Sequence, residues 1–383
     1  MRNYCLRFAL SPSLNFEPRM NALLDFCEKA KIDDVMFFIG AEDLYEGHIT
    51  IERAKRYTNL ILKVKDMLNK KGITISLNPW CTFSHYDAGR KLSLDQNFRT
   101  MVDANGTQAE VVVCPLCENW QKYYIELLSF YVETLHPKIL WFEDDFRMNN
   151  HEPVWNGCFC DEHMKIYNSR LNTSYTREEF VKKISYDVKV RKVYIDVIKE
   201  NIEDILAKFA EKINQPCFGI MTGGSGFQEG RDYEKLLTLI KKTNKPFERI
   251  CLYSYRQRGE QEYCWSLNKN SMLTRFSAGN KANCVSEIEN VPDTLYTKSV
   301  NYFRYQMLTS LQMNLYGDTF SMFEFNGNGA IEYDKYAKML AHIKPYLSAY
   351  EEIKLSPENA KGIKILISKY SYYTYKCKNF FEN

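Results

Sequence analysis

The stretch "KILWFEDDFR", residues 138–147, joins a short apolar run directly to three consecutive carboxylates, Glu143, Asp144 and Asp145. An unbroken run of large apolar residues is typical of a strand that is buried on both faces, as in a parallel sheet. In parallel barrels, functional side chains gather at the carboxyl ends of the strands. The stretch therefore predicts a buried parallel strand that ends at a functional site.

Seven further β-prone runs alternate with longer segments of helical period along the chain. The eight predicted strands span residues 4–10, 34–39, 73–78, 138–143, 216–221, 248–254, 283–288 and 318–325. The predicted helices span residues 19–31, 50–71, 119–135, 176–213, 232–243, 297–313 and 333–350, and the run 176–213 is long enough for two. Eight strands, most of them followed by a helix, predict an α/β protein whose parallel sheet closes into a (β/α)8 TIM barrel.

An open doubly wound sheet is the alternative architecture, and it fits less well. No glycine fingerprint follows the first predicted strand, and "MTGGSGFQEG", residues 221–230, lacks the Lys-Ser/Thr pair of a phosphate loop. After residue 355 the pattern restarts, because "KGIKILIS", residues 361–368, is typical of a new strand. We therefore predict a barrel domain over residues 1–355. Residues 356–383 are predicted to start a second α/β domain or to form a C-terminal extension.

The composition is that of a globular protein. The 383 residues are 45% hydrophobic, and the net charge of +3 is spread evenly, without the basic runs that bind nucleic acid. The N-terminus lacks the features of a signal peptide, and no apolar stretch approaches the length of a membrane span, so no membrane partner is expected. The twelve cysteines are scattered rather than arranged as a disulfide framework. Reduced thiols in a cytoplasmic protein are the preferred interpretation.

The carboxylates of the fourth predicted strand are expected to divide between two faces. Glu143 and Asp145 lie two residues apart, so in an extended chain they share the face that points to the barrel mouth. Asp144 is expected to point aside. An alternative remains open for each of these residues singly, because strand-end carboxylates also cap helices or pair with an arginine such as Arg147.

The next strands add further carboxylates. In "CVSEIENVP", residues 284–292, Glu287 and Glu289 share a face near the strand end, and Glu324 stands at the end of the eighth predicted strand. Burying several like charges in one mouth is costly unless function requires it. Two carboxyl groups on either side of a sugar ring are what glycosidic hydrolysis requires.

Aromatic residues also follow the predicted strands. Trp80 and Phe83 come after the third strand, Trp141 precedes the acidic cluster, and Tyr253 and Tyr255 end the sixth. Such rings stack on the C–H faces of sugars, although each of them singly is as well explained as a core residue.

A second cluster of polar residues has the composition of a metal site. "GCFCDEH", residues 157–163, contains Cys158, Cys160 and His163, and Cys114 and Cys117 lie upstream. Soft and borderline ligands at short spacings suit tetrahedral zinc, and thiolate-rich closed sites are usually structural. Unpaired buried thiols are the alternative, and a catalytic metal is a weaker one.

The fourth strand resembles that of glycoside hydrolase family 42, a family of retaining β-galactosidases with (β/α)8 barrels; the resemblance covers roughly residues 1–355. In that family an acid/base Glu follows an Asn at the end of strand four and precedes an aromatic residue. The resemblance places Asp144 in the Asn register and Asp145 in the acid/base register. Asp is one methylene shorter than Glu, which leaves Glu143 as a competing acid.

Two more features carry the same resemblance. The nucleophile of the family is a strand-seven Glu in a Glu-Gln-x-Pro context, and "ENVP", residues 289–292, implies Glu289 as nucleophile with Glu287 in reserve. The family has a zinc cluster of one upstream Cys and a C-x-C-x2-C motif, an order followed here, with His as the last ligand, by Cys114, Cys158, Cys160 and His163. A flavodoxin-like domain that mediates trimers follows the barrel in that family, and residues 361–368 resemble its first strand. The resemblance thus implies a homo-oligomer.

These observations predict a retaining hydrolase of a β-linked glycoside or oligosaccharide, galactoside-like or related, that needs no cofactor for catalysis. Glu289 would attack the anomeric carbon, and Asp145 or Glu143 would protonate the leaving oxygen. The residues expected to bind the substrate are Arg7, Asn78, Trp80, Asp144, Tyr253 and Glu324.

Two rival hypotheses remain at this stage. The first is a metal-dependent hydrolase in which Glu143, Asp145 and His151 hold a hard divalent ion. The second is a sugar-binding barrel without catalytic activity.

Overall fold

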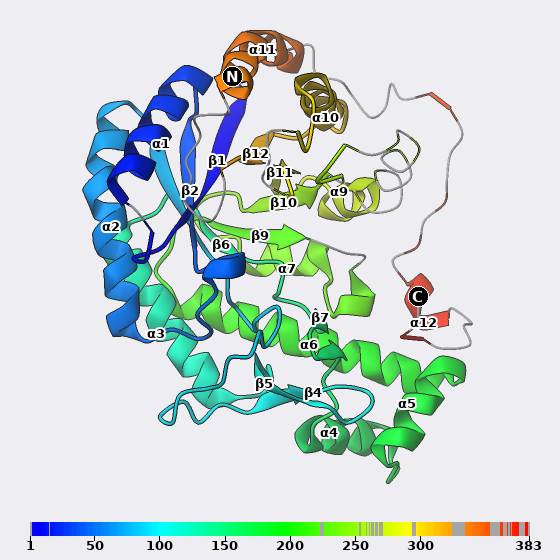
Figure 1. Cartoon of the computed structure of the whole chain (residues 1–383). Helices are drawn as coiled ribbons and strands as arrows, with labels where there is room; N and C mark the ends of the chain where they lie inside the picture. The colour runs from blue at the N-terminus through cyan, green and yellow to red at the C-terminus, as the bar shows by residue number, and fades with distance from the viewer. Residues whose placement is uncertain are drawn as a thin grey trace.

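The computed structural model is shown in Figure 1. It describes residues 2–14, 16–222, 226–252, 254–257, 259, 261, 264, 267, 271–292, 296–323, 334–352, 361–362, 366, 368, 370–374 and 380–381. Among these residues, no helix has the length and apolar character needed to cross a membrane.

Eight parallel strands close into a barrel in the order β1-β12-β11-β10-β9-β6-β3-β2. The strands are β1 (Asn3–Leu10), β2 (Asp34–Ile39), β3 (Thr74–Pro79), β6 (Leu140–Phe142), β9 (Phe218–Thr222), β10 (Phe247–Cys251), β11 (Asn283–Glu289) and β12 (Gly317–Ser321). Each predicted strand corresponds to one of them, so the prediction of a (β/α)8 barrel is confirmed. The open doubly wound alternative is wrong because β1 pairs with β12 and closes the sheet.

The helices surround the barrel, as Figure 1 shows. Those that cover it are α1 (Phe16–Ala30), α2 (Ile51–Lys70), α3 (Glu118–Leu135), α6 (Val188–Lys212), α7 (Tyr233–Leu239), α9 (Met272–Ala278), α10 (Val300–Gln312) and α11 (Asp334–Glu352). The predicted run 176–213 is two helices, α5 (Arg177–Tyr186) and α6. The break falls at Asp187, whose carboxylate accepts hydrogen bonds from the first backbone N–H groups of α6.

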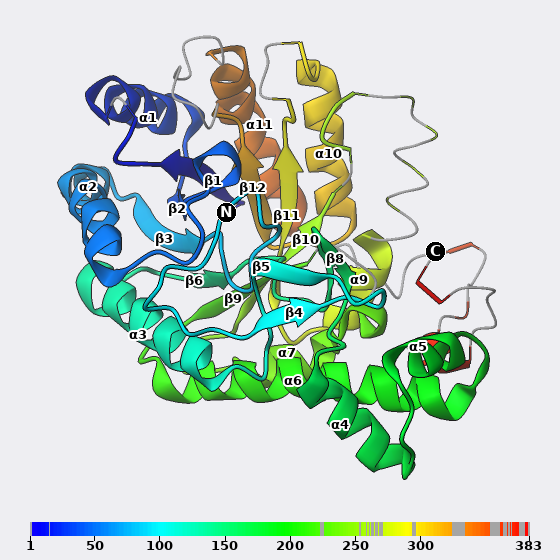
Figure 2. The same cartoon turned by 60° about the horizontal axis from the view of Figure 1, so that its bottom comes forward.

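Two long segments between strands and helices carry the smaller elements. The β3–α3 segment, residues 80–117, contains β4 (Thr100–Val102) and β5 (Gln108–Val113). The β6–α5 segment, residues 143–176, contains β7 (Asn149–His151), β8 (Val154–Asn156) and α4 (Asp161–Leu171). Both views show α4 and α5 next to α6 (Figures 1 and 2).

The two segments are joined to each other along their length. Tyr86 and Glu152 form a parallel backbone bridge, and Phe159 donates its backbone N–H to the carbonyl of Val102. They therefore form one continuous layer beside the barrel.

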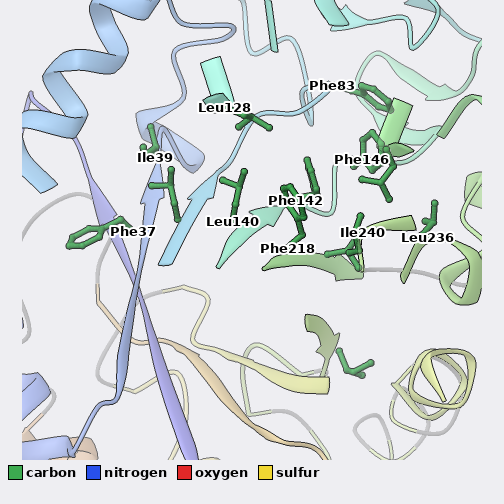
Figure 3. Packing of buried hydrophobic residues seen from close by; sticks show 14 of the residues in the cluster. Phe37, Ile39, Phe83, Leu128, Leu140, Phe142, Phe146, Phe218, Leu236 and Ile240 are labelled. Carbon is green, nitrogen blue, oxygen red and sulfur yellow. The ribbon is translucent and has the colours of Figure 1, made fainter. Parts of the chain in front are cut away.

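The main hydrophobic core lies between the strands and the helices. Figure 3 shows Leu140 and Phe142 of β6 among the neighbouring apolar side chains, and the rings of Phe142 and Phe218 stack with centroids 5.6 Å apart. Phe146 continues this core beyond the end of β6 and contacts Phe83 of the β3–α3 segment. The core thus extends under the loops that follow β3 and β6.

The interior of the barrel changes from apolar to charged along the strands. Its apolar layer consists of Cys5, Met36, Ile139, Trp141, Cys217, Met221, Phe247 and Val285. Trp141 fills the space beside Gly219, where an added Cβ would lie 2.4 Å from the indole ring. Two residues further along the same faces stand Arg7, Glu143, Arg249 and Glu287. Trp141 is therefore a core residue beneath the charged layer.

The C-terminal predictions fall largely outside the described residues. Of the predicted strand at residues 361–368, only residues 361–362, 366 and 368 are described. The described α12 (Ser371–Thr374) contacts α6, since the hydroxyl of Tyr373 donates to the carboxylate of Asp196 at 2.7 Å. The domain boundary after residue 355 stays a prediction.

Candidate active site and metal centre

Two arginines hold three carboxylates together at the mouth of the barrel. Arg249 of β10 lies 2.8 Å from Glu287 and 3.5 Å from both Glu143 and Glu289. Arg7 of β1 contacts Glu289 directly and lies 3.3 Å from Glu143. All five side chains are less than a tenth exposed. The carboxylates of two separate strands therefore meet at the same pair of guanidinium groups, which we call the mouth network.

The charges of the mouth network stabilise one another. Burial opposes the charge of Arg249, but Glu287 and Glu143 outweigh burial and hold its pKa above the ordinary value. Burial and the neighbouring Arg249 lower the pKa of Arg7, against the opposing effect of Glu143. The network thus sets two guanidinium groups against three carboxyl groups, with Asp144 beside them.

The predicted substrate residues Arg7 and Asn78 lie in this network. Nη2 of Arg7 donates to Oδ1 of Asn78 at 3.3 Å. Tyr255 also reaches the network, because its hydroxyl donates to Oε2 of Glu287 at 3.4 Å. Two further residues that were predicted to bind substrate, Tyr253 and Glu324, lie outside the described residues.

Asp144 lies beside the mouth network rather than away from it. Its carboxylate lies 3.4 Å from Nη1 of Arg147 and 3.6 Å from Nε2 of His85. Burial opposes ionisation of Asp144, but Arg147 and His85 outweigh it and lower the pKa of Asp144 below its ordinary value. Ligand atoms of His85, Glu143 and Asp144 lie within 4.8 Å of one another. Asp144 therefore pairs with Arg147, one of the partners that the sequence allowed for it, but it does so beside Glu143 rather than pointing away from the mouth.

Trp80 packs against His85. The rings of Trp80 and His85 stack with centroids 4.3 Å apart. Burial lowers the pKa of His85 to about 4, so its imidazole is neutral at physiological pH.

Asp145 does not share the mouth with Glu143, contrary to the expectation from alternation. β6 ends at Phe142 and the chain turns at residues 144–145, so the period-2 pattern stops before Asp145. Its carboxylate is fully buried, and Oδ2 accepts the backbone N–H groups of Thr82 at 2.6 Å and Ser84 at 2.8 Å. Burial raises the pKa of Asp145 to about 7.

Three residues of the site were not predicted from the sequence. Arg249 could have been noticed as an arginine inside an apolar strand run, on the face of Phe247 and Cys251. His85 lies in a loop whose conformation no sequence pattern indicates. Lys298 is buried behind Glu289, donates to its backbone carbonyl and has a pKa lowered to about 7 by burial.

The four predicted zinc ligands do come together. The ligand atoms of Cys114, Cys158, Cys160 and His163 are all buried and lie within 4.8 Å of one another. The separations are 3.8 Å between Sγ of Cys114 and Cys160, 3.9 Å between Sγ of Cys114 and Cys158, and 3.3 Å between Sγ of Cys160 and Nδ1 of His163. Ligands about 2.3 Å from a central zinc in tetrahedral geometry are about 3.8 Å apart, so the donor set fits that ion.

The neighbours of this cluster settle which upstream cysteine belongs to it. Sγ of Cys117 faces away and accepts the backbone N–H of Arg99 at 3.1 Å. On the other side, the side-chain amide of Asn201 lies 2.8 Å from Nε2 of His163 and fixes the orientation of its ring. The cluster therefore contains Cys114 and not Cys117.

Two of the three ligands proposed for a metal-dependent hydrolase, Asp145 and His151, contact the backbone of neighbouring segments instead. Nδ1 of His151 faces the carbonyl of Ser84 and Nε2 faces that of Arg147, so both ring nitrogens are occupied. Oδ2 of Asp145 is occupied by the backbone of the β3–α3 segment, whereas Oδ1 is buried and has no hydrogen-bond partner among the described residues. The other group at the mouth, His85 with Glu143 and Asp144, lies against guanidinium groups of three arginines, which disfavour a cation there.

Comparison with known proteins supports the fold. The sequence matches no protein-family model and no curated protein. Among solved structures, the catalytic domain of β-amylase from Paenibacillus polymyxa is similar with a TM-score of 0.57 and 10% identity, over 89% of this chain and 98% of that chain. The β-galactosidase from Rahnella sp. R3 gives a TM-score of 0.61 and 10% identity, over 91% of this chain and 56% of that chain.

A β-galactosidase from Bacillus circulans sp. alkalophilus gives a TM-score of 0.56 and 12% identity, over 90% of this chain and 57% of that chain. This chain thus spans little more than half of the two β-galactosidase chains. At such identities the likeness establishes the barrel fold, which glycoside hydrolases of several kinds share. Membership of glycoside hydrolase family 42 in particular stays a prediction.

Proposed function

We propose that this protein is a retaining glycoside hydrolase that acts on a β-linked glycoside. The observation that carries the proposal is the mouth network, in which Glu143 of one strand end and Glu289 of another contact the same guanidinium group of Arg7. Two carboxylates held on either side of a barrel mouth are the minimal machinery of glycosidic hydrolysis. The structural similarity to β-amylase and β-galactosidase barrels supports the same class of reaction.

Glu289 is the proposed nucleophile. A nucleophilic carboxylate must be ionised, and contacts with Arg7 and Arg249 favour that form. Lys298 holds the backbone carbonyl of Glu289 and so fixes the end of β11.

Glu143 is the proposed acid/base, in place of Asp145. Its two guanidinium contacts, at 3.3 Å and 3.5 Å, are long, and the short contact of Arg249 goes to Glu287 instead. Glu143 therefore pairs less closely with the arginines than Glu287 does. We assign the binding of sugar hydroxyls to Asp144 and Asn78, and Trp80 stacks on His85 beside Asp144.

The second proposal concerns the metal centre. We propose that Cys114, Cys158, Cys160 and His163 bind one structural zinc ion, which pins α4 to the end of β5. Zinc of this closed type contributes folding energy rather than chemistry.

The test of the catalytic proposal is a panel of aryl glycosides with α and β linkages, assayed with the wild type and with Glu289→Gln. We expect turnover of a β-glycoside by the wild type, a loss of at least a thousandfold in the variant, and labelling of Glu289 by the matching 2-fluoro glycoside. Labelling of Glu287 would reassign the nucleophile, and a product of inverted anomeric configuration would exclude retention.

A matched control is available on the neighbouring strand. Glu248 of β10 is fully buried but alternates with Arg249, so it faces away from the mouth. Burial raises the pKa of Glu248 to about 8, so this carboxyl is neutral at pH 7 and Glu248→Gln should keep activity. An assay with a chelator separates this proposal from a metal-dependent hydrolase, and wild-type turnover excludes a sugar-binding barrel without activity.

A further inference from the structure

The wall of the mouth beside Asp144 is a single loop, residues 80–86, which we call the β3 loop. It carries Trp80 at its start and His85 near its end; the two rings stack, and His85 lies next to Asp144. Nε2 of His85 is buried and makes no hydrogen bond with any residue that the structure describes, although it lies 3.6 Å from Oδ1 of Asp144. A buried imidazole nitrogen without a partner at the edge of a substrate site is an unused hydrogen-bonding group.

The β3 loop is held in a backbone conformation that non-glycine residues rarely adopt. Ser84, immediately before His85, has a φ of 92°. Such conformations persist only where the surrounding structure imposes them. The position of His85 therefore depends on whatever holds Ser84.

Asp145 is one of the groups that hold it. One carboxylate oxygen accepts two backbone N–H groups of the loop, from Thr82 and Ser84. Other contacts hold Ser84 as well: its carbonyl meets Nδ1 of His151 at 2.5 Å, and its hydroxyl meets that of Tyr45 and donates to the carbonyl of Tyr86 at 2.9 Å. Because Asp145 follows β6 directly, it ties the loop after β3 to the end of the strand that carries Glu143.

The other residues of the loop have supports of their own. The backbone N–H groups of Val113 and Glu152 donate to the carbonyls of Phe83 and His85 at 3.0 Å and 3.1 Å. The hydroxyl of Tyr124 in α3 donates to Oγ1 of Thr82 at 3.3 Å, and Sγ of Cys81 lies 3.7 Å from Nδ1 of His48, which precedes α2. Among the described residues, Asp145 is the side chain that engages the backbone N–H of the strained Ser84.

We propose that Asp145 is a positioning residue, which clamps the β3 loop so that His85 presents Nε2 to a hydroxyl group of the bound sugar. The proposal rests on the glycoside hydrolase function proposed above and assigns two residues beyond it. It replaces the acid/base role that the family resemblance implied for Asp145. Oδ2 of this fully buried carboxylate accepts two backbone N–H groups, which makes the loop its direct partner.

The experiment compares Asp145→Asn with Asp145→Ala by hydrogen exchange and by kinetics. The amide oxygen of Asn can accept the same two N–H groups, whereas Ala cannot. In a peptide that covers residues 80–86, we expect unchanged exchange in Asp145→Asn and at least tenfold faster exchange in Asp145→Ala. In aryl glycoside assays, Asp145→Asn should stay within about threefold of the wild type for good and poor leaving groups alike, without rescue by azide.

His85→Ala tests the presented group. We expect it to raise KM at least tenfold while kcat falls less than threefold, with normal exchange of the loop, and Asp145→Ala should show the same split between KM and kcat. An unchanged KM in His85→Ala would overturn the role of His85.

The clamp itself is overturned by either of two results. One is a selective loss of poor-leaving-group substrates in Asp145→Asn together with azide rescue, which is the behaviour of an acid/base. The other is wild-type exchange of the loop in Asp145→Ala. The hydrogen-exchange measurement needs no turnover, so it tests the clamp even if no glycoside is hydrolysed. If Asp145→Ala does not fold, the leaving-group dependence and azide response of Asp145→Asn still test the proposal.

Discussion

Arg249 is the residue on which the mouth network depends most. Its side chain is 2% exposed and contacts Glu143, Glu287 and Glu289. Without it, three buried carboxylates would share Arg7 as their cation. Arg249 therefore supplies one of the two positive charges of the network.

We expect Arg249→Met to lower the free energy of unfolding by about 3–5 kcal/mol, because removal of one partner leaves uncompensated buried charges. Urea unfolding measures the change. The double variant with Glu287→Gln removes a charge of each sign and should recover part of the loss. Equal stability of the single and double variants would contradict this account.

Asp145 predicts a pH dependence of stability. Burial raises its pKa in the folded protein to about 7 from the ordinary 3.8. Its stabilising contribution is therefore full below pH 3.8 and is lost as the pH rises through 7. The shift corresponds to an effect on the order of 4 kcal/mol. The unfolding free energy of the wild type relative to Asp145→Asn should increase as the pH falls from 8 to 5.

Asp144→Asn is the matched control for this measurement. The pKa of Asp144 is lowered in the folded protein, so its contribution is present above pH 3.8 and is lost only below that value. The unfolding free energy of the wild type relative to Asp144→Asn should stay constant between pH 8 and 5. A constant difference for Asp145→Asn as well would show that Asp145 does not titrate in this range.

The direction in which a side chain points could be predicted from the sequence where the residue lies on a regular strand. Glu143, Glu287 and Glu289 stand on or immediately after regular strands, and the structure brings them together as predicted. Asp144 and Asp145 lie past the end of β6, where a turn redirects both side chains. The sequence contains no signal for that turn, because the three consecutive carboxylates fit a continued strand equally well.

At the scale of elements, β9 and β6 fit together through one small residue. An added Cβ at Gly219 would lie 2.4 Å from Trp141, whose indole fills the barrel beneath the charged layer. We expect Gly219→Ala to lower stability by about 1–3 kcal/mol through overpacking. Thermal unfolding measures the effect.

Gly259 provides the control for the loss of a glycine. An added Cβ there meets nothing within 4 Å, so Gly259→Ala should leave the melting temperature nearly unchanged. The double variant Gly219→Ala with Trp141→Phe should regain part of the stability because the smaller ring leaves room. If the double variant were the less stable of the two, the clash would not be the cause.

Elements were easier to predict than residues because their signals are periodic. Apolar runs predicted every barrel strand, and the helical period predicted α1, α2, α3, α10 and α11 within a few residues. The short strands β4, β5, β7 and β8 were missed. Three of them span only three residues, which is too short for an alternating pattern to be recognised, and backbone pairing with neighbouring segments creates them.

At the scale of the whole molecule, the cysteine cluster joins parts of the chain that are distant in sequence. We expect about one zinc ion per chain in the purified protein and a coupled loss of zinc and melting temperature in Cys160→Ser. Cys117→Ser is the matched control, since Cys117 is buried and adjacent but lies outside the cluster. Equal zinc content in the two variants would exclude the proposed site.

The barrel itself is predictable although the sequence is only 10–12% identical to those of similar barrels. Closure depends on the number, spacing and apolar character of the strands, which many sequences satisfy. The specificity for the proposed sugar substrate would depend on a few polar atoms at the mouth, and no pattern of this kind encodes them.

The joined β3–α3 and β6–α5 segments have a consequence for protein engineering. Exchange of single loops between related barrels is a common route to new substrate specificity, and it assumes that each loop is an independent module. Here the β3 loop takes its shape from Asp145 and His151, which belong to the other segment. A chimera that grafts only one of the two would separate the loop from its clamp, so both must be transplanted together.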